Sequence, residues 1–117
     1  MARVDALVPD LLFGSKVQAM LAAGGHDVEL AGPDALRERA PGADVLVVDL
    51  TAEPDARIAA AEGLGVPTLA FYSHVEANVR ERALAAGFDS VVPRSRMARE
   101  GAELVTRLAG TPGRTSP

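Results

Sequence analysis

The chain has 117 residues, of which 48% are hydrophobic and 24% charged, with a formal net charge of -4 at pH 7. This length suits one compact domain, and the composition excludes disordered, collagen-like and coiled-coil chains. The acidic balance of 16 Asp and Glu against 12 Lys and Arg argues against nucleic acid as a partner. The chain has no cysteine, which excludes disulfides, zinc-thiolate sites and thiol nucleophiles.

No apolar run approaches the roughly 20 residues that a membrane-spanning helix needs. The start of the chain, Met1-Ala2-Arg3-Val4-Asp5, lacks the apolar stretch of a secretory signal. We therefore expect a cytoplasmic protein that does not contact a membrane.

Short apolar runs alternate with helical patterns about five times along the chain, which is typical of parallel βαβ units. The pattern predicts strands, in chain order, at residues 4–8, 27–30, 45–48, 68–72 and 90–92. Three helices are predicted between the first four strands: one that follows Pro9-Asp10 and stops at Gly24-Gly25, a short one from Pro33, and one from Pro54 to about Glu62. The fourth predicted helix has the inner residues Val75, Val79 and Ala83 and stops at Gly87. The last predicted helix has on its buried face Met97, Gly101, Leu104, Val105 and Leu108. Ser95 is expected to cap this last helix. Residues 1–110 form a single domain in this prediction, and residues 111–117 form a flexible tail.

The third run, Val45-Leu46-Val47-Val48, is apolar without interruption, as expected for a central strand buried on both faces. The second and fifth strands are the weakest and shortest, which favours edge positions for them. These features predict a doubly wound α/β fold whose five-stranded parallel sheet has the flavodoxin-like order 2-1-3-4-5. In that order, a crevice lies at the carboxyl ends of strands one and three, which carry Asp10 and Asp49.

Two carboxylates at one crevice repel each other unless one is protonated or a cation lies between them. Asp10, Asp49 and the backbone carbonyl of Thr51 make a set of hard oxygen ligands suited to Mg2+. An aspartate beside such an ion can attack a phosphoryl group, because the metal neutralises charge on both reactants. The alternative is that each aspartate only ends its strand and caps the helix or turn that follows. Spacing alone favours this alternative, since acids often end strands in α/β folds.

The strand Val45-Leu46-Val47-Val48-Asp49 and the position of Asp10 resemble the receiver domain of bacterial two-component response regulators, including its single-domain chemotaxis-type members. The resemblance covers residues 3–109. It implies that Asp49 is the phosphoacceptor and that Asp10 is the acid that holds Mg2+. It also implies a hydroxyl switch position at Tyr72 or Ser73, and it aligns Arg94 with the lysine that follows the fifth strand of the family.

Several positions depart from the receiver pattern. Pro9 replaces the first acid of the pair that follows strand one, and the proline that normally comes after the lysine is absent. Arg94 keeps the positive charge of that lysine, but its planar guanidinium does not reproduce a compact ammonium group. These changes leave the expected acceptor and one metal-binding acid in place and alter the residues that would read out phosphorylation.

Two functions follow from the resemblance. In the first, Asp49 accepts a phosphoryl group with Mg2+, Arg94 pairs with the phosphate, and Ser73 or Thr51 supplies a hydroxyl. In the second, the chain is a pseudo-receiver that binds a signalling protein, a histidine kinase or an effector, without phosphorylation. The changed positions favour the second function, because such chemistry needs all its preorganised parts. No enzymatic activity is expected beyond self-phosphorylation and dephosphorylation at Asp49.

A third possible function is the binding of a flavin or a nucleotide, because the same crevice holds the flavin phosphate in flavodoxins. The loop from Pro9 to Lys16 contains Gly14 and Ser15, but it lacks the spaced glycines that wrap a phosphate, and Asp10 would repel one. Lys16 is better explained as a solvated helix residue than as a phosphate ligand.

Other polar residues favour structural roles. His74 follows the fourth strand without a visible base or metal partner, which favours a helix cap over a ligand. The basic cluster formed by Arg94, Arg96 and Arg99 is typical of a solvated face. His26 lies in a helix-to-strand turn at the opposite end of the sheet, and no chemistry is assigned to it.

The resemblance also implies a homodimer, since receivers dimerise through the face made by the fourth helix, the fifth strand and the fifth helix. Apolar residues in this region are Phe71, Tyr72, Val75, Phe88 and Met97, most of which are expected to lie in the core.

Overall fold

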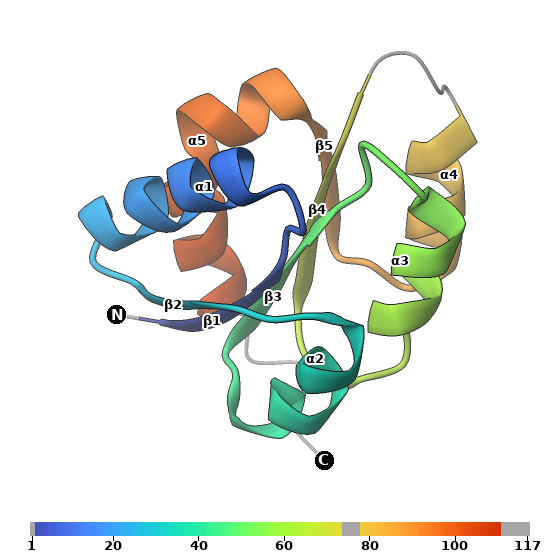
Figure 1. Cartoon of the computed structure of the whole chain (residues 1–117), viewed down its shortest axis with the longest axis horizontal. Coiled ribbons are helices and arrows are strands. Elements are labelled where there is room, and N and C mark those ends of the chain that lie inside the picture. The colour runs from blue at the N-terminus through green and yellow to red at the C-terminus, as the bar shows by residue number, and fades with distance from the viewer. Residues whose placement is uncertain (1, 74–77, 111–117) are drawn as a thin grey trace.

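The computed structural model describes residues 2–73 and 78–110. In this part of the chain the strands are β1 (Arg3–Leu7), β2 (Asp27–Leu30), β3 (Val45–Asp49), β4 (Thr68–Tyr72) and β5 (Ser90–Pro93). The helices are α1 (Leu11–Ala23), α2 (Pro33–Arg39), α3 (Pro54–Ala61), α4 (Asn78–Ala85) and α5 (Arg94–Ala109), with a short 3-10 helix at Ala40–Gly42. The predicted alternation of strands and helices is therefore confirmed (Figure 1).

The described strands form one parallel sheet in the order β2-β1-β3-β4-β5. The register pairs Leu7 of β1 with Val48 of β3, and Asp49 of β3 with Phe71 of β4. The carboxyl ends of β1, β3 and β4 therefore lie next to one another along one edge of the sheet. The flavodoxin-like fold predicted from the sequence is confirmed.

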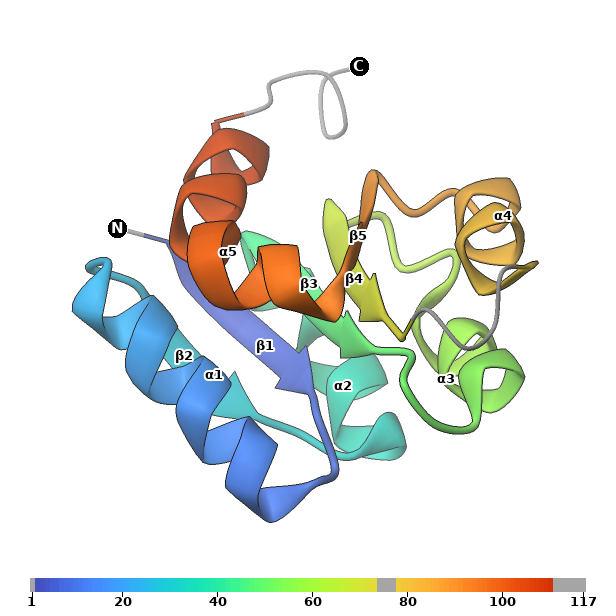
Figure 2. The ribbon, with the colours of Figure 1, turned by 90° about the horizontal axis from the view of Figure 1, so that it is seen from above.

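Helices cover both faces of the sheet. On one face α1 and α5 lie side by side, as Figure 2 shows, and enclose a core that includes Val17, Leu21, Phe71, Met97 and Val105. On the other face α2, α3 and α4 enclose a second core that includes Leu36, Leu46, Ile58, Val79 and Ala83. This two-sided cover explains the patterns of the strands: β3 is buried along its whole length, whereas the edge strand β2 alternates exposed and buried residues.

The ends of two helices show which local predictions hold. Gly24 ends α1 as predicted, and Gly25 follows with a φ of 91°, a left-handed backbone that glycine adopts at little cost. The prediction that Ser95 caps α5 is wrong. The N-cap is Pro93, whose backbone is extended (φ -62°, ψ 150°), so the chain passes directly from β5 into the helix and Ser95 falls inside its first turn.

Three predictions fall on residues outside the described ranges: the helix-cap role of His74, the place of Val75 in the inner stripe of α4, and the tail at 111–117. Val79 and Ala83, the other members of that stripe, are buried as predicted. Within residues 2–73 and 78–110, every helix is too short or too polar to cross a lipid bilayer.

Candidate functional site

Asp49 ends β3 at the carboxyl edge of the sheet and is 2% exposed. It is buried because the apolar residues of β3 place the whole strand, including its last residue, between the two helical layers. A buried carboxylate is stable only when hydrogen bonds and a counter-charge compensate for the water it has lost. The loop after β3 and the helix α3 supply both.

Thr51 supplies the hydrogen bonds to Asp49. Its backbone N–H donates to Asp49 Oδ1 at 2.8 Å, and its hydroxyl donates to the same oxygen at 2.6 Å. Such contacts are typical of an aspartate that stabilises the turn after its own strand. The structure therefore brings Asp49 and Thr51 together, and in this arrangement Thr51 is a hydrogen-bond donor to the carboxylate.

Arg57 of α3 supplies the counter-charge, and the sequence predictions missed it. Its Nη1 lies 3.5 Å from Asp49 Oδ2 and donates to the backbone carbonyl of Asp49 at 3.0 Å. The side chain is 13% exposed, and its Nη2 lies 4.0 Å from Oε2 of Glu53. One sequence signal was present: Arg57 follows Glu53 by four residues and Pro54 marks the start of a helix, so the two side chains share a helical face.

Asp10 caps α1. Its Oδ1 accepts a hydrogen bond from the backbone N–H of Phe13 at 2.9 Å, and the residue is exposed. This contact satisfies one of the free N–H groups at the start of the helix. The capping role that the sequence offered as the alternative for Asp10 is thus present in the structure.

The predicted Mg2+ ligands do not form a metal site among the described residues. Among the described residues there is no group of three His, Asp or Glu side chains that could hold a metal ion. Both oxygens of the Asp49 carboxylate already face donors, and a cation that approached Oδ2 would meet the Arg57 guanidinium. A Mg2+ site formed by Asp10, Asp49 and Thr51 therefore stays a prediction.

Arg94 stacks on an aromatic ring at the start of α5. Its Cζ lies 4.3 Å from the ring centroid of Phe13, the geometry of a cation–π pair. Phe13 in turn meets Phe71 of β4 edge to face, with ring centroids 5.3 Å apart. Arg94 thus links α5 to α1, and its role as a phosphate partner stays a prediction.

Tyr72 and Ser73 lie at the same edge of the sheet as Asp49, because β4 pairs with β3. Tyr72 ends β4 opposite Pro93, and both Tyr72 and Ser73 are half-buried and interact with other residues. Their role as a hydroxyl switch stays a prediction. His74 lies outside the described residues.

His26 has a structural role that its sequence position did not reveal. The residue is 7% exposed, and its Nδ1 accepts a hydrogen bond from the backbone N–H of Ala2 at 3.2 Å. Its Nε2 lies 3.1 Å from the carbonyl oxygen of Ala102 and 3.1 Å from the hydroxyl oxygen of Thr106. A neutral imidazole that carries its hydrogen on Nε2 fits these partners and joins the start of the chain to α5.

The core absorbs most of the apolar residues predicted near the dimer face. Phe71, Phe88 and Met97 are buried, and Tyr72 is half-buried. Leu84 of α4 is 39% exposed. The homodimer stays a prediction, with Leu84 as the apolar residue that α4 offers to it.

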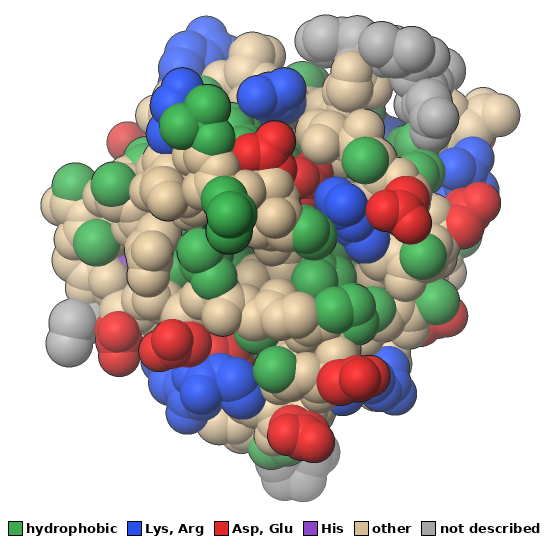
Figure 3. Space-filling model, viewed as in Figure 1, with side chains coloured by type: hydrophobic (Ala, Val, Ile, Leu, Met, Phe, Trp, Pro, Cys, Tyr) green, Lys and Arg blue, Asp and Glu red, His purple; other side chains and the backbone are tan. Residues whose placement is uncertain are grey.

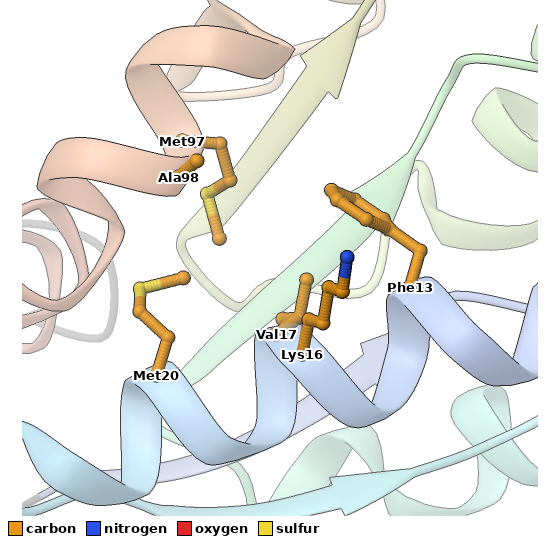
Figure 4. Close-up of a pocket in the computed structure, with 6 residues that line it drawn as sticks. All are labelled: Phe13, Lys16, Val17, Met20, Met97 and Ala98. Atoms are coloured by element: carbon orange, nitrogen blue, oxygen red, sulfur yellow. The ribbon is translucent and has the colours of Figure 1, made fainter.

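A groove of about 190 Å³ lies between α1 and α5. Its lining residues are Phe13, Lys16, Val17, Met20, Met97 and Ala98, and Figure 4 shows the ends of Met20 and Met97 pointing toward each other across it. Cofactor sites usually have about 300–1,000 Å³ and several placed polar groups. A flavin or a nucleotide is therefore not favoured by this groove.

A second apolar feature lies where α1 begins. Leu11 is 83% and Leu12 is 71% exposed. Leu11 also lines a groove of about 250 Å³. The other lining residues are Val8, Pro9, Leu30, Ala31, Gly32 and Pro33. Figure 3 shows one face of the molecule, on which hydrophobic side chains lie among polar and charged ones. Apolar groups exposed in this way are a common property of protein-binding surfaces.

No protein-family model matches the chain, and no curated protein matches its sequence. Solved structures do match its fold. The receiver domain of the sensor histidine kinase PA1611 from Pseudomonas aeruginosa, which has a magnesium ion coordinated in its active-site cleft, matches with a TM-score of 0.74 and 20% identity over 94% of this chain and 98% of that chain. A CheY-like protein (tadZ) from the same organism matches with a TM-score of 0.74 and 23% identity over 100% of this chain and 99% of that chain. A pilus assembly-related protein from Burkholderia pseudomallei matches with a TM-score of 0.77 and 19% identity over 97% of this chain and 94% of that chain.

These matches define the class of the fold, which is that of response-regulator receiver domains. The resemblance seen in the sequence is confirmed at this level. The sequence of this chain has diverged far from those of the proteins whose fold it shares: its identity to the tadZ protein is 23%.

Proposed function

We propose that this chain is a pseudo-receiver, a signalling module that binds a protein partner and is not switched by phosphorylation. The observation that supports this function is the engagement of Asp49, whose Oδ1 accepts two hydrogen bonds from Thr51 and whose Oδ2 lies 3.5 Å from Arg57. A phosphoacceptor has to present a carboxylate oxygen to the phosphoryl donor beside a cation. In this chain, residues of the following loop and helix hold those positions.

The state of Asp10 supports the same function. In the phosphoacceptor hypothesis this carboxylate holds Mg2+ together with Asp49, whereas here it is exposed and caps α1. Each aspartate thus has a local structural task, and the two tasks account for both residues without phosphoryl chemistry.

The partner is a signalling protein that the chain binds constitutively, so we favour an effector over a histidine kinase. The similarity to a pilus assembly-related protein supports a role in which the domain holds a partner within a larger assembly. The exposed residues Leu11, Leu12 and Leu84 offer apolar contacts for protein binding.

Amide NMR of the wild-type chain tests this function. Mg2+ is added up to about 20 mM, far above a useful site affinity, and beryllofluoride, which mimics a phosphoryl group, is added next. We expect the amide signals of Asp10, Asp49 and Arg94 to stay in place. Asp49→Asn and Asp10→Asn serve as matched variants that each remove one carboxylate charge with little change of volume.

Large shifts at Asp10, Asp49 and Arg94 that vanish in either variant would contradict the proposal. That outcome would establish the alternative, a receiver that is phosphorylated on Asp49 with Mg2+, and would direct the search to a histidine kinase.

A further inference from the structure

We propose that Arg57 is the permanent cation of the Asp49 site and takes the position where a divalent metal ion would bind. The proposal rests on the pseudo-receiver function and names the residue that keeps the site in one state. The guanidinium makes two contacts with one residue: its Nη1 lies 3.5 Å from Asp49 Oδ2 and donates to the Asp49 carbonyl oxygen at 3.0 Å.

The loop and α3 direct Arg57 to this position. Glu53 has a left-handed backbone (φ 46°) immediately before α3, a conformation that costs energy for a residue with a side chain. The backbone N–H of Arg57 donates to the carbonyl oxygen of Glu53 at 3.2 Å, which places Arg57 in the first turn of the helix. The bend at Glu53 turns this first turn back toward the end of β3, and the guanidinium reaches Asp49.

Burial makes this cation effective. The side chain of Asp49 is 3% exposed and that of Arg57 is 13% exposed, so water and salt screen their attraction only weakly. A buried carboxylate without a counter-charge is strongly unfavourable, and a nearby arginine relieves this cost in the absence of any metal. The site is therefore complete within the chain itself.

A divalent cation competes with Arg57 for the same carboxylate. Because Oδ1 is held by Thr51, a metal would have to approach Oδ2, where it meets the guanidinium as a like charge. The metal must displace Arg57 before it can bind. The loop after β3 and the first turn of α3 therefore keep one conformation as long as Arg57 stays on Asp49.

Paramagnetic NMR with Mn2+ as the probe tests the replacement of a metal by Arg57. Mn2+ broadens amide signals near its binding site, which gives an affinity at Asp49 for the wild type and for Arg57→Met, which keeps the length and removes the charge. We expect Arg57→Met to bind Mn2+ at least about tenfold more tightly than the wild type, equivalent to about 1.4 kcal/mol, and Asp49→Asn/Arg57→Met to lose this binding. Equal affinities in the wild type and Arg57→Met would overturn the proposal.

Two further variants test whether a positive charge is needed and whether it must be at residue 57. Arg57→Lys keeps a cation on α3 and is expected to keep the weak Mn2+ binding of the wild type. Arg82→Met is the matched control, because Arg82 pairs with Asp55 at 2.8 Å on the surface, with both side chains exposed. A gain of Mn2+ binding at Asp49 in Arg82→Met as large as that in Arg57→Met would also overturn the proposal, since it would reflect net charge alone.

A double-mutant cycle in urea tests the counter-charge without any metal. We expect Asp49→Asn to raise the unfolding equilibrium constant at least about tenfold in the wild type and less than about threefold in the Arg57→Met background. Equal effects in the two backgrounds would overturn the proposal. If Arg57→Met does not fold, Arg57→Gln replaces it in both experiments, with the same expected results.

The experiments distinguish a failure of the pseudo-receiver function from a failure of the role proposed for Arg57. A response of the wild type to Mg2+ and beryllofluoride at Asp49 would refute the pseudo-receiver, whether or not the urea cycle shows coupling. A silent wild type without coupling between Asp49 and Arg57 would leave the pseudo-receiver in place and refute the role of Arg57.

Discussion

Single polar residues in this chain hold segments of backbone together. Asp49 accepts from Thr51, Asp10 caps α1, and His26 joins the start of the chain to α5. Asp5 in the middle of β1 is fully buried, and its Oδ1 accepts a hydrogen bond from Arg39 at 3.1 Å. Each of these residues has a polar type that suggests chemistry, and each makes a structural contact.

The hydroxyl of Thr51 gives a prediction at the residue scale. Thr51→Val removes the 2.6 Å hydrogen bond to Asp49 and keeps the shape of the side chain. We expect the free energy of unfolding in urea to fall by about 1–2 kcal/mol, because a nearly buried carboxylate oxygen loses a donor. Thr51→Ser keeps the hydroxyl and is expected to stay within about 0.5 kcal/mol of the wild type. Equal losses in Thr51→Val and Thr51→Ser would show that the hydroxyl does not stabilise the loop.

Close approach of α1 and α5 is the main feature at the scale of elements. Gly101 of α5 lies against the ends of Met20 and Met97, and Gly24 at the end of α1 lies against Ala102. A Cβ at Gly24 would stand 2.6 Å from the Cβ of Ala102, far inside a normal contact. Small residues at these positions let the two helices pack directly against each other.

Substitution of the two glycines tests this packing. Gly24→Ala is expected to lower the free energy of unfolding by about 1–3 kcal/mol, because neither short side chain can move aside. The atoms nearest to the new Cβ in Gly101→Ala are the flexible ends of Met20 and Met97, at 2.8 Å and 3.0 Å, and the substitution gains helix propensity of about 1 kcal/mol. We therefore expect Gly101→Ala to be close to neutral in urea unfolding. A larger loss in Gly101→Ala than in Gly24→Ala would refute this account of the interface.

The described part of the chain buries one core on each side of the sheet and exposes few large apolar side chains. In the described part of the chain the exposed large hydrophobic residues are Leu11, Leu12 and Leu84. Leu11 and Leu12 begin α1, and Leu84 lies on α4, in the face through which the sequence predicts a homodimer. We expect a dimer through that face to use Leu84 as an apolar contact.

Self-association gives the prediction at the scale of the molecule. We predict a concentration-dependent dimer of the wild type in sedimentation equilibrium and its weakening by at least about tenfold in Leu84→Glu, because a buried charge at an apolar contact is costly. Leu12→Glu is the matched control and is expected to leave the dimer unchanged. If Leu12→Glu disrupts self-association and Leu84→Glu does not, the dimer face lies at the start of α1.

Much of the fold was predictable because its signals are local. The uninterrupted apolar run Val45–Val48 predicted a central strand, and Gly24-Gly25 predicted the end of the first helix. The error at Ser95 has a local cause as well. Serine is a good N-cap, but Pro93 already supplies the extended backbone from which α5 begins.

The sequence by itself determined the order of strands and helices and the place of Asp49 at the end of β3, because hydrophobic periodicity and helix-ending residues act over a few positions. It also indicated the sheet order, because the apolar content and length of a strand distinguish central from edge positions. The contacts of that carboxylate were decided only by the tertiary structure. Arg57 reaches Asp49 because α3 packs against the sheet after a left-handed turn at Glu53, and His26 reaches α5 across 80 positions of sequence. The direction of such side chains depends on how distant elements pack, which no local pattern specifies.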